Sequence, residues 1–310
     1  MSVFEDGNTV YRSGVVAIAG RPNVGKSTLV NALMGWKYSI VSSKPQTTRH
    51  CTRYVFSGKE GQVVLMDTPG LHRPLHLLGR TMEKNLLKAL SQVDMVCLVT
   101  EATDKSVGPA DRILVDRIAC GASVPVFLVV NKTDLVSDPA EAAERIRGFY
   151  EGSLEICDEA LVSAEKNAGV DGLARRLVER MPPGPPLYPE DMAGDFSERF
   201  LAAEIIREKI LEQTEQEVPH SVAVVVEEFK SPDEYPERNT LFVRAEIYVE
   251  RPGQKGILIG KGGSKLKAVA TAARVDIEHQ FGWKVYLDLW IKVRPRWREN
   301  ESDLRRMGLL

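Results

Sequence analysis

The chain has 310 residues, four cysteines and a formal net charge of −2. This length exceeds what one ordinary hydrophobic core organises, so two domains are expected. The cysteines lack the spacing of a zinc site or a disulfide framework, which favours a reducing, cytoplasmic location. The first thirteen residues carry acids without an apolar core, and no apolar run reaches membrane-spanning length, so we expect neither a signal peptide nor a transmembrane helix.

Residues 20–27 read Gly-Arg-Pro-Asn-Val-Gly-Lys-Ser, which is the pattern of a phosphate-binding loop. The apolar run 15–19 predicts a buried parallel strand before the loop, and 27–33 has the spacing of a helix after it. This context disfavours a chance glycine-rich turn, and the backbone N–H groups and helix N-terminus would attract a polyphosphate. We expect Lys26 to reach the terminal phosphates as a catalytic group and Ser27 to ligate Mg²⁺. The other loop residues expected to bind the nucleotide are Asn23, Val24, Gly25 and Thr28.

The polar segment 37–50 is too irregular for a helix and is interpreted as a switch. A threonine here could bind Mg²⁺ and the terminal phosphate only while that phosphate is present, so the segment would order with one nucleotide and loosen with another. We expect Thr48 to be this metal ligand and to act in catalysis, with Thr47 as the alternative. A plain solvated loop is the simpler interpretation, which the position before a strand capped by aspartate disfavours.

Two short strands at 53–56 and 63–66 should form a hairpin, and the second strand ends in Asp67-Thr68-Pro69-Gly70. Asp67 would lie at the carboxyl end of a strand, where α/β proteins bind ligands, and could hold Mg²⁺ through water. The Gly70 backbone N–H could contact the γ-phosphate and act in catalysis by coupling that phosphate to the following segment.

Further buried strands at 95–100 and 124–130, separated by a helix at 110–120, continue the alternation of strand and helix. The second of these strands is followed by Asn131-Lys132-Thr133-Asp134. The Asp134 carboxylate can accept hydrogen bonds from both guanine N1–H and N2–H₂, a pair of donors that adenine lacks. The expected ligands are therefore GTP and GDP.

Three more residues complete the expected guanine site. Asn131 should tie the base-binding loop to the phosphate loop, and the Lys132 stem should cover the face of the base. Ser163 and Ala164 follow a helix at 140–150 and a short strand at 160–162, and the Ala164 N–H would contact guanine O6. Residues 15–181 are thus expected to be an α/β P-loop GTPase domain with a mostly parallel six-stranded sheet.

These motifs, in this order, resemble those of the translation-factor-like small GTPases. Asn23 occupies the position that helps to coordinate a monovalent cation in the potassium-activated members, so the resemblance implies K⁺ beside the phosphates. Leu71 stands where Ras-like members carry the glutamine that orients the attacking water. We therefore expect slow intrinsic GTP hydrolysis, accelerated by a partner or an ion.

Residues 182–194 begin with Pro-Pro-Gly-Pro-Pro, which is stiff and cannot continue a helix, so this linker should end the first domain. No function is assigned to the N-terminal extension 1–14. Beyond the linker, residues 190–250 hold six basic and sixteen acidic residues, whereas 251–298 hold eleven basic and three acidic residues. An anionic partner should bind the second of these stretches.

The second domain, 195–310, is expected to contain a helix at 198–214, strands at 222–226 and 241–249, and a closing strand at 286–293. Between them, 257–267 predicts a helical turn, a glycine-flanked loop and a second helix running through Ala273. This order resembles the bacterial, type II form of the KH domain, an α+β fold whose loop clamps a nucleic-acid backbone. A plain helix–helix connection is the alternative, which the basic surroundings disfavour. The residues expected to bind RNA are Ile259, Gly260, Lys261, Gly262, Gly263, Lys265 and Lys267.

The segment after the closing strand should extend the basic surface through Arg294, Arg296 and Arg298. Trp297 has two interpretations: stacking on a base, or packing at the edge of the domain.

A guanine-nucleotide switch joined to a single C-terminal KH domain resembles the bacterial ribosome-associated GTPases of this architecture. The segments 45–50, 67–74 and 204–209 carry this resemblance most strongly. It implies a monomer that binds the single-stranded 3′ end of small-subunit ribosomal RNA and assists assembly of the small ribosomal subunit. Partial peripheral association with the inner membrane face is left open.

Two other classes of function stay open at this point. A signalling GTPase at the membrane would need a lipidation motif or a basic amphipathic helix, and neither is evident. An RNA-binding module could instead use the nucleotide only structurally, which a turnover assay would distinguish from an enzyme.

Overall fold

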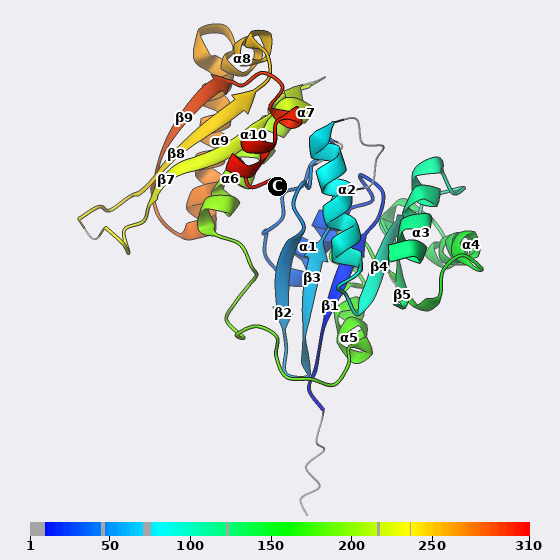
Figure 1. Cartoon of the computed structure of the whole chain (residues 1–310). Helices are drawn as coiled ribbons and strands as arrows, with labels where there is room; N and C mark the ends of the chain where they lie inside the picture. The colour runs from blue at the N-terminus through cyan, green and yellow to red at the C-terminus, as the bar shows by residue number, and fades with distance from the viewer. Residues whose placement is uncertain (1–9, 45–46, 71–75, 122–123, 216–217, 236) are drawn as a thin grey trace, which may run out of the picture. The chain divides into compact units, whose positions relative to one another are not determined.

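The computed structural model describes residues 10–44, 47–70, 76–121, 124–215, 218–235 and 237–310 (Figure 1). The chain forms two compact units. The first comprises the described residues within Met1–Lys37, His50–His72 and Lys84–Asp195, and the second those within Tyr38–Arg49, Arg73–Glu83 and Phe196–Leu310. In the part of the chain that is described, no helix is both long and apolar enough to cross a membrane. All four cysteines are free thiols.

The first unit is built on a six-stranded sheet of order β2-β3-β1-β4-β5-β6. Only the β2–β3 pair is antiparallel, which confirms the predicted mostly parallel sheet. The strands buried on both faces read as continuous apolar runs, as expected where helices cover both sides. The strands are β1 (Arg12–Ala19), β2 (Thr52–Ser57), β3 (Gly61–Asp67), β4 (Met95–Glu101), β5 (Val126–Asn131) and β6 (Ile156–Leu161).

Helices cover both faces of this sheet. The helices α1 (Lys26–Met34) and α5 (Val170–Arg180) pack against each other and contact β3. A separate apolar core joins the sheet to the end of α2 (Leu77–Leu90) and to α3 (Pro109–Gly121) and α4 (Pro139–Tyr150). α2 is shared between the units, since its residues up to Glu83 belong to the second unit. Because the sheet is wrapped in this way, the loops at the carboxyl ends of its strands are where a ligand site can form.

The predicted N-terminal extension is shorter than residues 1–14, because β1 already begins at Arg12. The Arg12 N–H donates to the Glu60 carbonyl oxygen at 3.2 Å, and the Ser13 N–H donates to the Pro182 carbonyl oxygen at 3.0 Å. The start of the proline-rich segment is therefore hydrogen-bonded to the first strand.

The rest of the proline-rich segment is also held on the first unit. The buried Gln62 side chain accepts hydrogen bonds from the backbone N–H groups of Leu187 (2.7 Å) and Tyr188 (2.9 Å), and donates to the Tyr188 carbonyl oxygen at 2.9 Å. Further along, the Asp195 N–H donates to the Arg53 carbonyl oxygen at 3.1 Å. The segment is thus part of the first unit and is not a free spacer.

The second unit contains a three-stranded sheet of order β7-β8-β9, antiparallel between β7 and β8 and parallel between β8 and β9. One sheet face forms a single core with three helices, α6, α8 and α9. The order of α6, the first two strands, α8, α9 and the last strand agrees with the predicted KH fold. The strands are β7 (Ala223–Lys230), β8 (Leu241–Val249) and β9 (Val285–Val293). The helices are α6 (Glu198–Gln213), α7 (Val218–Ser221), α8 (Pro252–Ile259), α9 (Ser264–Phe281) and α10 (Glu301–Arg306).

A smaller apolar cluster covers one end of the opposite face of this sheet. Its buried members include Tyr248 of β8, Trp297, and Leu304 of α10, together with Leu78 and Met82 from the beginning of α2. Two stretches that precede the linker in sequence, the described residues of 38–49 and residues 76–83, therefore belong to the second unit.

Candidate functional site

The phosphate-binding loop connects β1 to α1 and is shaped by close internal contacts. Gly25 has a φ of 94°, and a Cβ there would lie 2.4 Å from Asn131 Nδ2, so only glycine fits. The buried Lys26 side chain folds back across the loop, where its Nζ donates to the carbonyl oxygens of Gly20 (2.9 Å) and Arg21 (3.0 Å). Burial lowers the pKa of Lys26 to about 8, and the Asp67 carboxylate partly opposes this shift. An ammonium group held here is ready to pair with phosphate oxygens.

Four of the predicted phosphate and metal residues come together in the first unit. The Ser27 Oγ donates to Asp67 Oδ2 at 3.2 Å, and Asp67 is fully buried at the end of β3. A Cβ added to Gly70 would lie 3.3 Å from Lys26 Nζ, so the Gly70 backbone lies beside the lysine. A hydroxyl and a carboxylate at this point suit Mg²⁺, which prefers oxygen ligands and completes its shell with water and substrate phosphates. The described residues contain no group of three or more His, Cys, Asp or Glu side chains that could hold a metal ion unaided.

The predicted guanine-binding residues also converge in the first unit. The Asn131 Nδ2 donates to the Val24 carbonyl oxygen at 2.9 Å, and its Oδ1 accepts from the Ala164 N–H at 3.0 Å. The Ser163 Oγ donates to Asp134 Oδ1 at 2.5 Å, which orients an exposed carboxylate. One buried asparagine therefore ties the phosphate loop to the segment predicted to contact guanine O6.

A charged network beside this site was missed by the sequence analysis. Glu101, the last residue of β4, accepts from Lys132 Nζ at 2.6 Å through Oε1 and from Arg21 Nη2 at 3.2 Å through Oε2. It bridges the base-binding loop and the phosphate loop, and Asp104 also pairs with Arg21. The position of Glu101 at the carboxyl end of a buried strand was the available sequence signal.

The predicted switch threonines belong to the second unit. The Thr47 Oγ1 donates to the Lys44 carbonyl oxygen at 2.6 Å, and the Thr47 carbonyl oxygen accepts from Arg207 of α6. The assignment of Thr48 as the Mg²⁺ ligand, with Thr47 as the alternative, stays a prediction. Pro45, Gln46 and the segment from Leu71 to Pro74 lie outside the described residues.

The glycine-flanked loop of the second unit connects α8 to α9. Gly260, Gly262 and Gly263 have φ values of 71°, 61° and 78°, which are left-handed conformations that favour glycine. A Cβ at Gly260 would lie 2.8 Å from the Lys265 Cβ, whereas a Cβ at Gly262 would meet nothing within 4 Å. The loop is thus held tightly on one side and open on the other, where a nucleic-acid backbone could approach.

Half-buried aliphatic side chains adjoin this loop, and we take this strip as the candidate RNA groove. Ile259 and Leu266 flank the glycines and, with Leu287 and Leu289 of β9, are partly buried against the core of the second unit. Such half-covered aliphatic side chains can receive unstacked bases while the loop holds the backbone.

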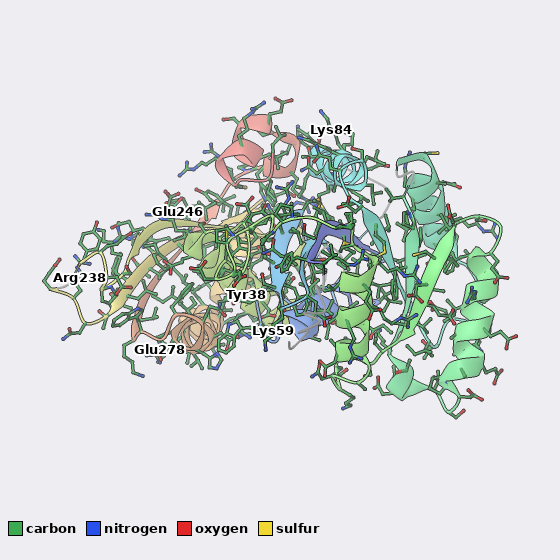
Figure 2. All side chains as sticks on the ribbon, turned by 90° about the horizontal axis from the view of Figure 1, so that it is seen from below. Tyr38, Lys59, Lys84, Arg238, Glu246 and Glu278 are labelled. Carbon is green, nitrogen blue, oxygen red and sulfur yellow. The ribbon has the colours of Figure 1, made fainter. Side chains whose placement is uncertain are left out.

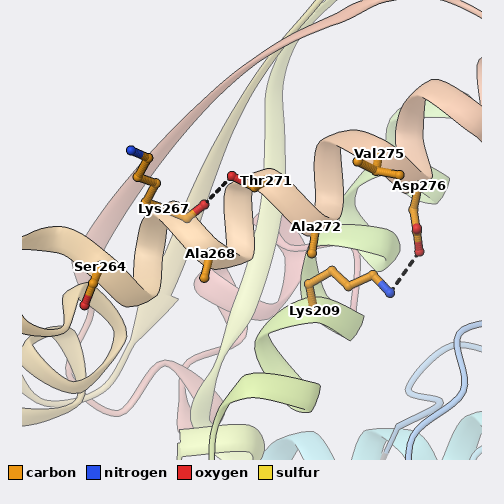
Figure 3. A pocket seen from close by; sticks show the side chains of 8 residues that line it. All are labelled: Lys209, Ser264, Lys267, Ala268, Thr271, Ala272, Val275 and Asp276. Carbon is orange, nitrogen blue, oxygen red and sulfur yellow. Dashed lines mark hydrogen bonds and ion pairs between the residues drawn. The ribbon is translucent and has the colours of Figure 1, made fainter.

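The cations of the second unit differ in whether they are already paired. Among the described residues, the cations on α8, the loop and α9 that form no ion pair are Lys255, Lys261, Lys265, Lys267 and Arg274. A hollow of about 640 Å³ lies along this side of α9, lined by Lys267, Thr271 and Lys209 among others; Figure 3 shows Lys209 turned toward Asp276, 2.9 Å away. These unpaired cations therefore place positive charge on the helical side of the domain, around the loop.

The predicted basic extension after β9 is largely wrong. Arg294 pairs with Asp303 at 2.9 Å and Arg298 pairs with Glu250, so two of its three cations are neutralised within the unit. Trp297 is fully buried, and its Nε1 donates to the Ser221 carbonyl oxygen at 2.9 Å. Of its two interpretations, packing holds and stacking on a base does not.

These features define a P-loop GTPase domain followed by a KH domain, and comparison with known proteins agrees. Residues 15–132 match the family model described as 50S ribosome-binding GTPase, and residues 217–298 match that of the KH domain. GTPase Era of Carboxydothermus hydrogenoformans is 45% identical over 298 residues, which cover 96% of this chain and 98% of that protein. GTPase Era of Thermotoga maritima is 44% identical over 300 residues, covering 96% and 97%.

Two solved structures are equally similar in fold. One is a point variant of Aquifex aeolicus Era bound to GDP and AlF₄⁻, and the other is Era in complex with MgGDPNP and nucleotides 1506–1542 of 16S ribosomal RNA. Each has a TM-score of 0.90 and 38% identity, and covers 96% of this chain and 99% of the solved chain. The chain belongs to the Era family of GTPases. It is accordingly a GTP hydrolase that uses GTP, GDP and Mg²⁺, so a purely structural use of the nucleotide does not apply.

Proposed function

We propose that this protein is a GTP-controlled switch that holds the single-stranded 3′ end of small-subunit ribosomal RNA and assists assembly of the small ribosomal subunit. The observation that carries the proposal is the open glycine loop flanked by unpaired lysines, since it joins a backbone clamp to a local positive field. The complex of Era with nucleotides 1506–1542 of 16S ribosomal RNA supports the choice of RNA.

For the hydrolytic step, we assign roles to the predicted nucleotide-site residues. Lys26 would pair with the terminal phosphates, and the Gly70 N–H would bind the γ-phosphate beside it. Ser27, Asp67 and Thr48 would hold Mg²⁺, which when bound neutralises charge that develops on the phosphate oxygens. Asp134 would read guanine, with Ser163 orienting its carboxylate. No glutamine follows Gly70, so we expect intrinsic turnover to be slow.

The nucleotide would control RNA binding through the switch segment 38–49. The described residues of this segment belong to the second unit, where the Val41 N–H donates to Glu208 Oε1 of α6 at 2.8 Å. A phosphate that draws Thr48 toward Mg²⁺ must compete with such contacts, so GTP and GDP would favour different states of the RNA-binding unit. Linkage then requires RNA to alter nucleotide affinity by the same factor, typically about 5–150-fold.

The direct test replaces both Lys261 and Gly262 with aspartate, which places carboxylates where the RNA backbone must lie. We expect this variant to lose binding to an RNA of 16S nucleotides 1506–1542 with either GDPNP or GDP, while GTP affinity without RNA is unchanged. Lys59→Asp, at an exposed lysine of the β2–β3 turn labelled in Figure 2, is the matched control. Retained RNA binding by the double variant, measured at one salt concentration, would reject the proposed clamp.

The role in assembly needs a cellular measurement. Cells in which the double aspartate variant replaces the protein should accumulate precursors of the small subunit on sucrose gradients, whereas Lys59→Asp should not. We further expect the protein to act in the cytoplasm as a monomer, which sedimentation at micromolar concentration would check. Peripheral association with the inner membrane face is tested by co-sedimentation with anionic vesicles.

A further inference from the structure

The face of the second unit's sheet that lies opposite α6, α8 and α9 carries exposed aromatic rings. Tyr286 and Trp290 of β9 are 62% and 57% exposed. Phe242 of β8 lies directly opposite Tyr286 in the strand register, and their rings are stacked with centroids 5.6 Å apart and planes 8° apart. The covered end of the same face, around Tyr248 and Trp297, does not reach these rings.

This aromatic face is continuous with the candidate RNA groove through β9. Successive side chains of a strand point to opposite faces, so Leu287 and Leu289 turn toward the helices and the groove while Tyr286 and Trp290 turn outward. β9 is an edge strand of the three-stranded sheet, and both α8 and α9 contact it. A strand of RNA leaving the groove has only this one edge to cross before it reaches the aromatic rings.

The charges on this face favour stacking over phosphate binding. Three cationic groups surround the Phe242 ring, with centroid distances of 5.7 Å from Lys230, 6.0 Å from Arg238 and 5.4 Å from Arg244. Arg238 lies in the connection between β7 and β8, at the far end of the hairpin in Figure 2. Lys230 and Arg244 are neutralised by acidic partners, including Glu228 at 2.5 Å from Lys230 and Asp288 at 2.9 Å from Arg244. The face therefore offers flat π surfaces with little free charge.

We propose that Tyr286 and Trp290 form a second RNA subsite, on which bases stack from nucleotides adjoining those held by the Gly260–Gly263 loop. Exposed aromatic rings on a sheet are an established physical means of binding unstacked bases, and they tolerate different base identities. A protein partner could also use exposed aromatic residues, but continuity with the groove favours RNA. The subsite rests on the proposed RNA-binding function and lengthens the RNA segment that the domain holds.

The test compares Tyr286→Ala and Trp290→Ala with the unaltered protein, using an RNA of 16S nucleotides 1506–1542 and fluorescence anisotropy at one salt concentration. Each substitution should weaken binding about 5- to 150-fold, the range found when an aromatic ring that stacks on a base is removed. Tyr286→Phe and Trp290→Phe should retain most of the affinity, because they keep a stacking ring. Trp36→Ala, at another exposed tryptophan, is the control and should leave RNA affinity unchanged.

A spectroscopic readout separates stacking from a structural effect. In a variant carrying Trp36→Phe and Trp283→Phe, the fluorescence comes from Trp290 and the buried Trp297, and RNA should quench the Trp290 component. Unchanged affinity of both alanine variants, with melting temperatures as in the unaltered protein, would overturn the subsite. If those variants then bound purified small subunits more weakly, the face would be a protein-docking surface instead. Neither outcome bears on RNA binding by the Gly260–Gly263 loop, because the variant with both Lys261→Asp and Gly262→Asp tests that loop independently.

Discussion

The Arg49 guanidinium lies over the indole ring of Trp297, with its Cζ 5.8 Å from the ring centroid, and its Nη1 donates to the Val222 carbonyl oxygen at 2.7 Å. Both side chains are buried. The Arg49 Nη2 also donates to the carbonyl oxygens of Pro219 (3.4 Å) and His220 (3.3 Å). A residue of the predicted switch segment is therefore an internal support of the second unit.

Replacing Arg49 should lower the thermal stability of the protein and weaken the control of RNA binding by the nucleotide. Arg49→Ala removes donors from three buried or partly buried carbonyl groups, each costing about 1–3 kcal/mol if left unsatisfied. We expect a lower melting temperature and a smaller difference in RNA affinity between the GDPNP and GDP states. Calorimetry and anisotropy measure the two effects. Val41→Ala is the control, since its exposed side chain can be shortened while its backbone N–H still reaches Glu208. An undiminished nucleotide effect in Arg49→Ala would contradict the idea.

Nucleotide affinity should decrease as the pH rises through about 8. Burial lowers the pKa of Lys26 to about 8 in the free protein, and nearby phosphates must raise it. Above that pH the free protein has lost a proton that the complex holds, so binding takes up a proton and weakens by up to about tenfold per pH unit. Well below pH 8 both forms are protonated and this dependence vanishes. Titration calorimetry with GDP from pH 6.5 to 9 measures how affinity changes with pH. Guanosine lacks phosphates, so its affinity should not show this dependence on Lys26.

Asp134→Asn should exchange the preferred base. The variant loses a charge-assisted pair of hydrogen bonds to guanine, which should cost about 1.5–3 kcal/mol of GTP affinity. Xanthosine triphosphate should bind it better than it binds the unaltered protein, because the 2-oxo group of xanthine accepts from the amide. Ser163→Ala should have a smaller effect on GTP, since it only releases the Asp134 carboxylate. Equal GTP affinity of Asp134→Asn and the unaltered protein would exclude this assignment.

GTP hydrolysis should depend on the monovalent cation. Asn23 adopts a left-handed conformation with a φ of 68° in the phosphate loop, at the position that suggests a potassium site. Exchanging KCl for NaCl at equal ionic strength should slow turnover, and Asn23→Ala should remove the difference between the salts. Mant-GDP binding in both salts is the control for altered nucleotide affinity. Identical rates in the two salts would end the potassium hypothesis.

The convergence of most of the candidate nucleotide-site residues could be predicted from sequence because they lie in short motifs at the ends of buried strands. Each motif sits directly after an apolar run, and a parallel sheet brings the carboxyl ends of such runs together. Glu101 was missed because a single glutamate after a strand belongs to no sequence motif. Its bridging position is visible only in the structure, where it pairs with both Arg21 and Lys132. The helices α2 and α5 were not predicted; α2 follows residues outside the described part of the chain.

Other errors arose from long-range pairing, which local patterns do not encode. Helix α9 runs to Phe281, eight residues beyond the predicted end at Ala273, because its later residue Ile277 packs in the core. Arg294 and Arg298 looked like free cations, yet their partners Asp303 and Glu250 come from other elements. The sequence order also suggested two successive domains, whereas the described residues of 38–49 and residues 76–83 belong to the C-terminal unit.

The Gln62 side chain limits how much of the proline-rich segment is free of the first unit. If residues 182–195 were free, a chain of fourteen residues could extend about 46 Å. Because the segment is bonded to β1, Gln62 and Arg53 up to Asp195, only the step to Ser197, which caps α6, is left, and it spans roughly 7 Å. The proline-rich stretch therefore offers a protease little backbone that is free of the first unit. Gln62→Ala removes the side chain that bonds Leu187 and Tyr188, so it should open the proline-rich stretch to proteases without altering any residue proposed to bind nucleotide or RNA.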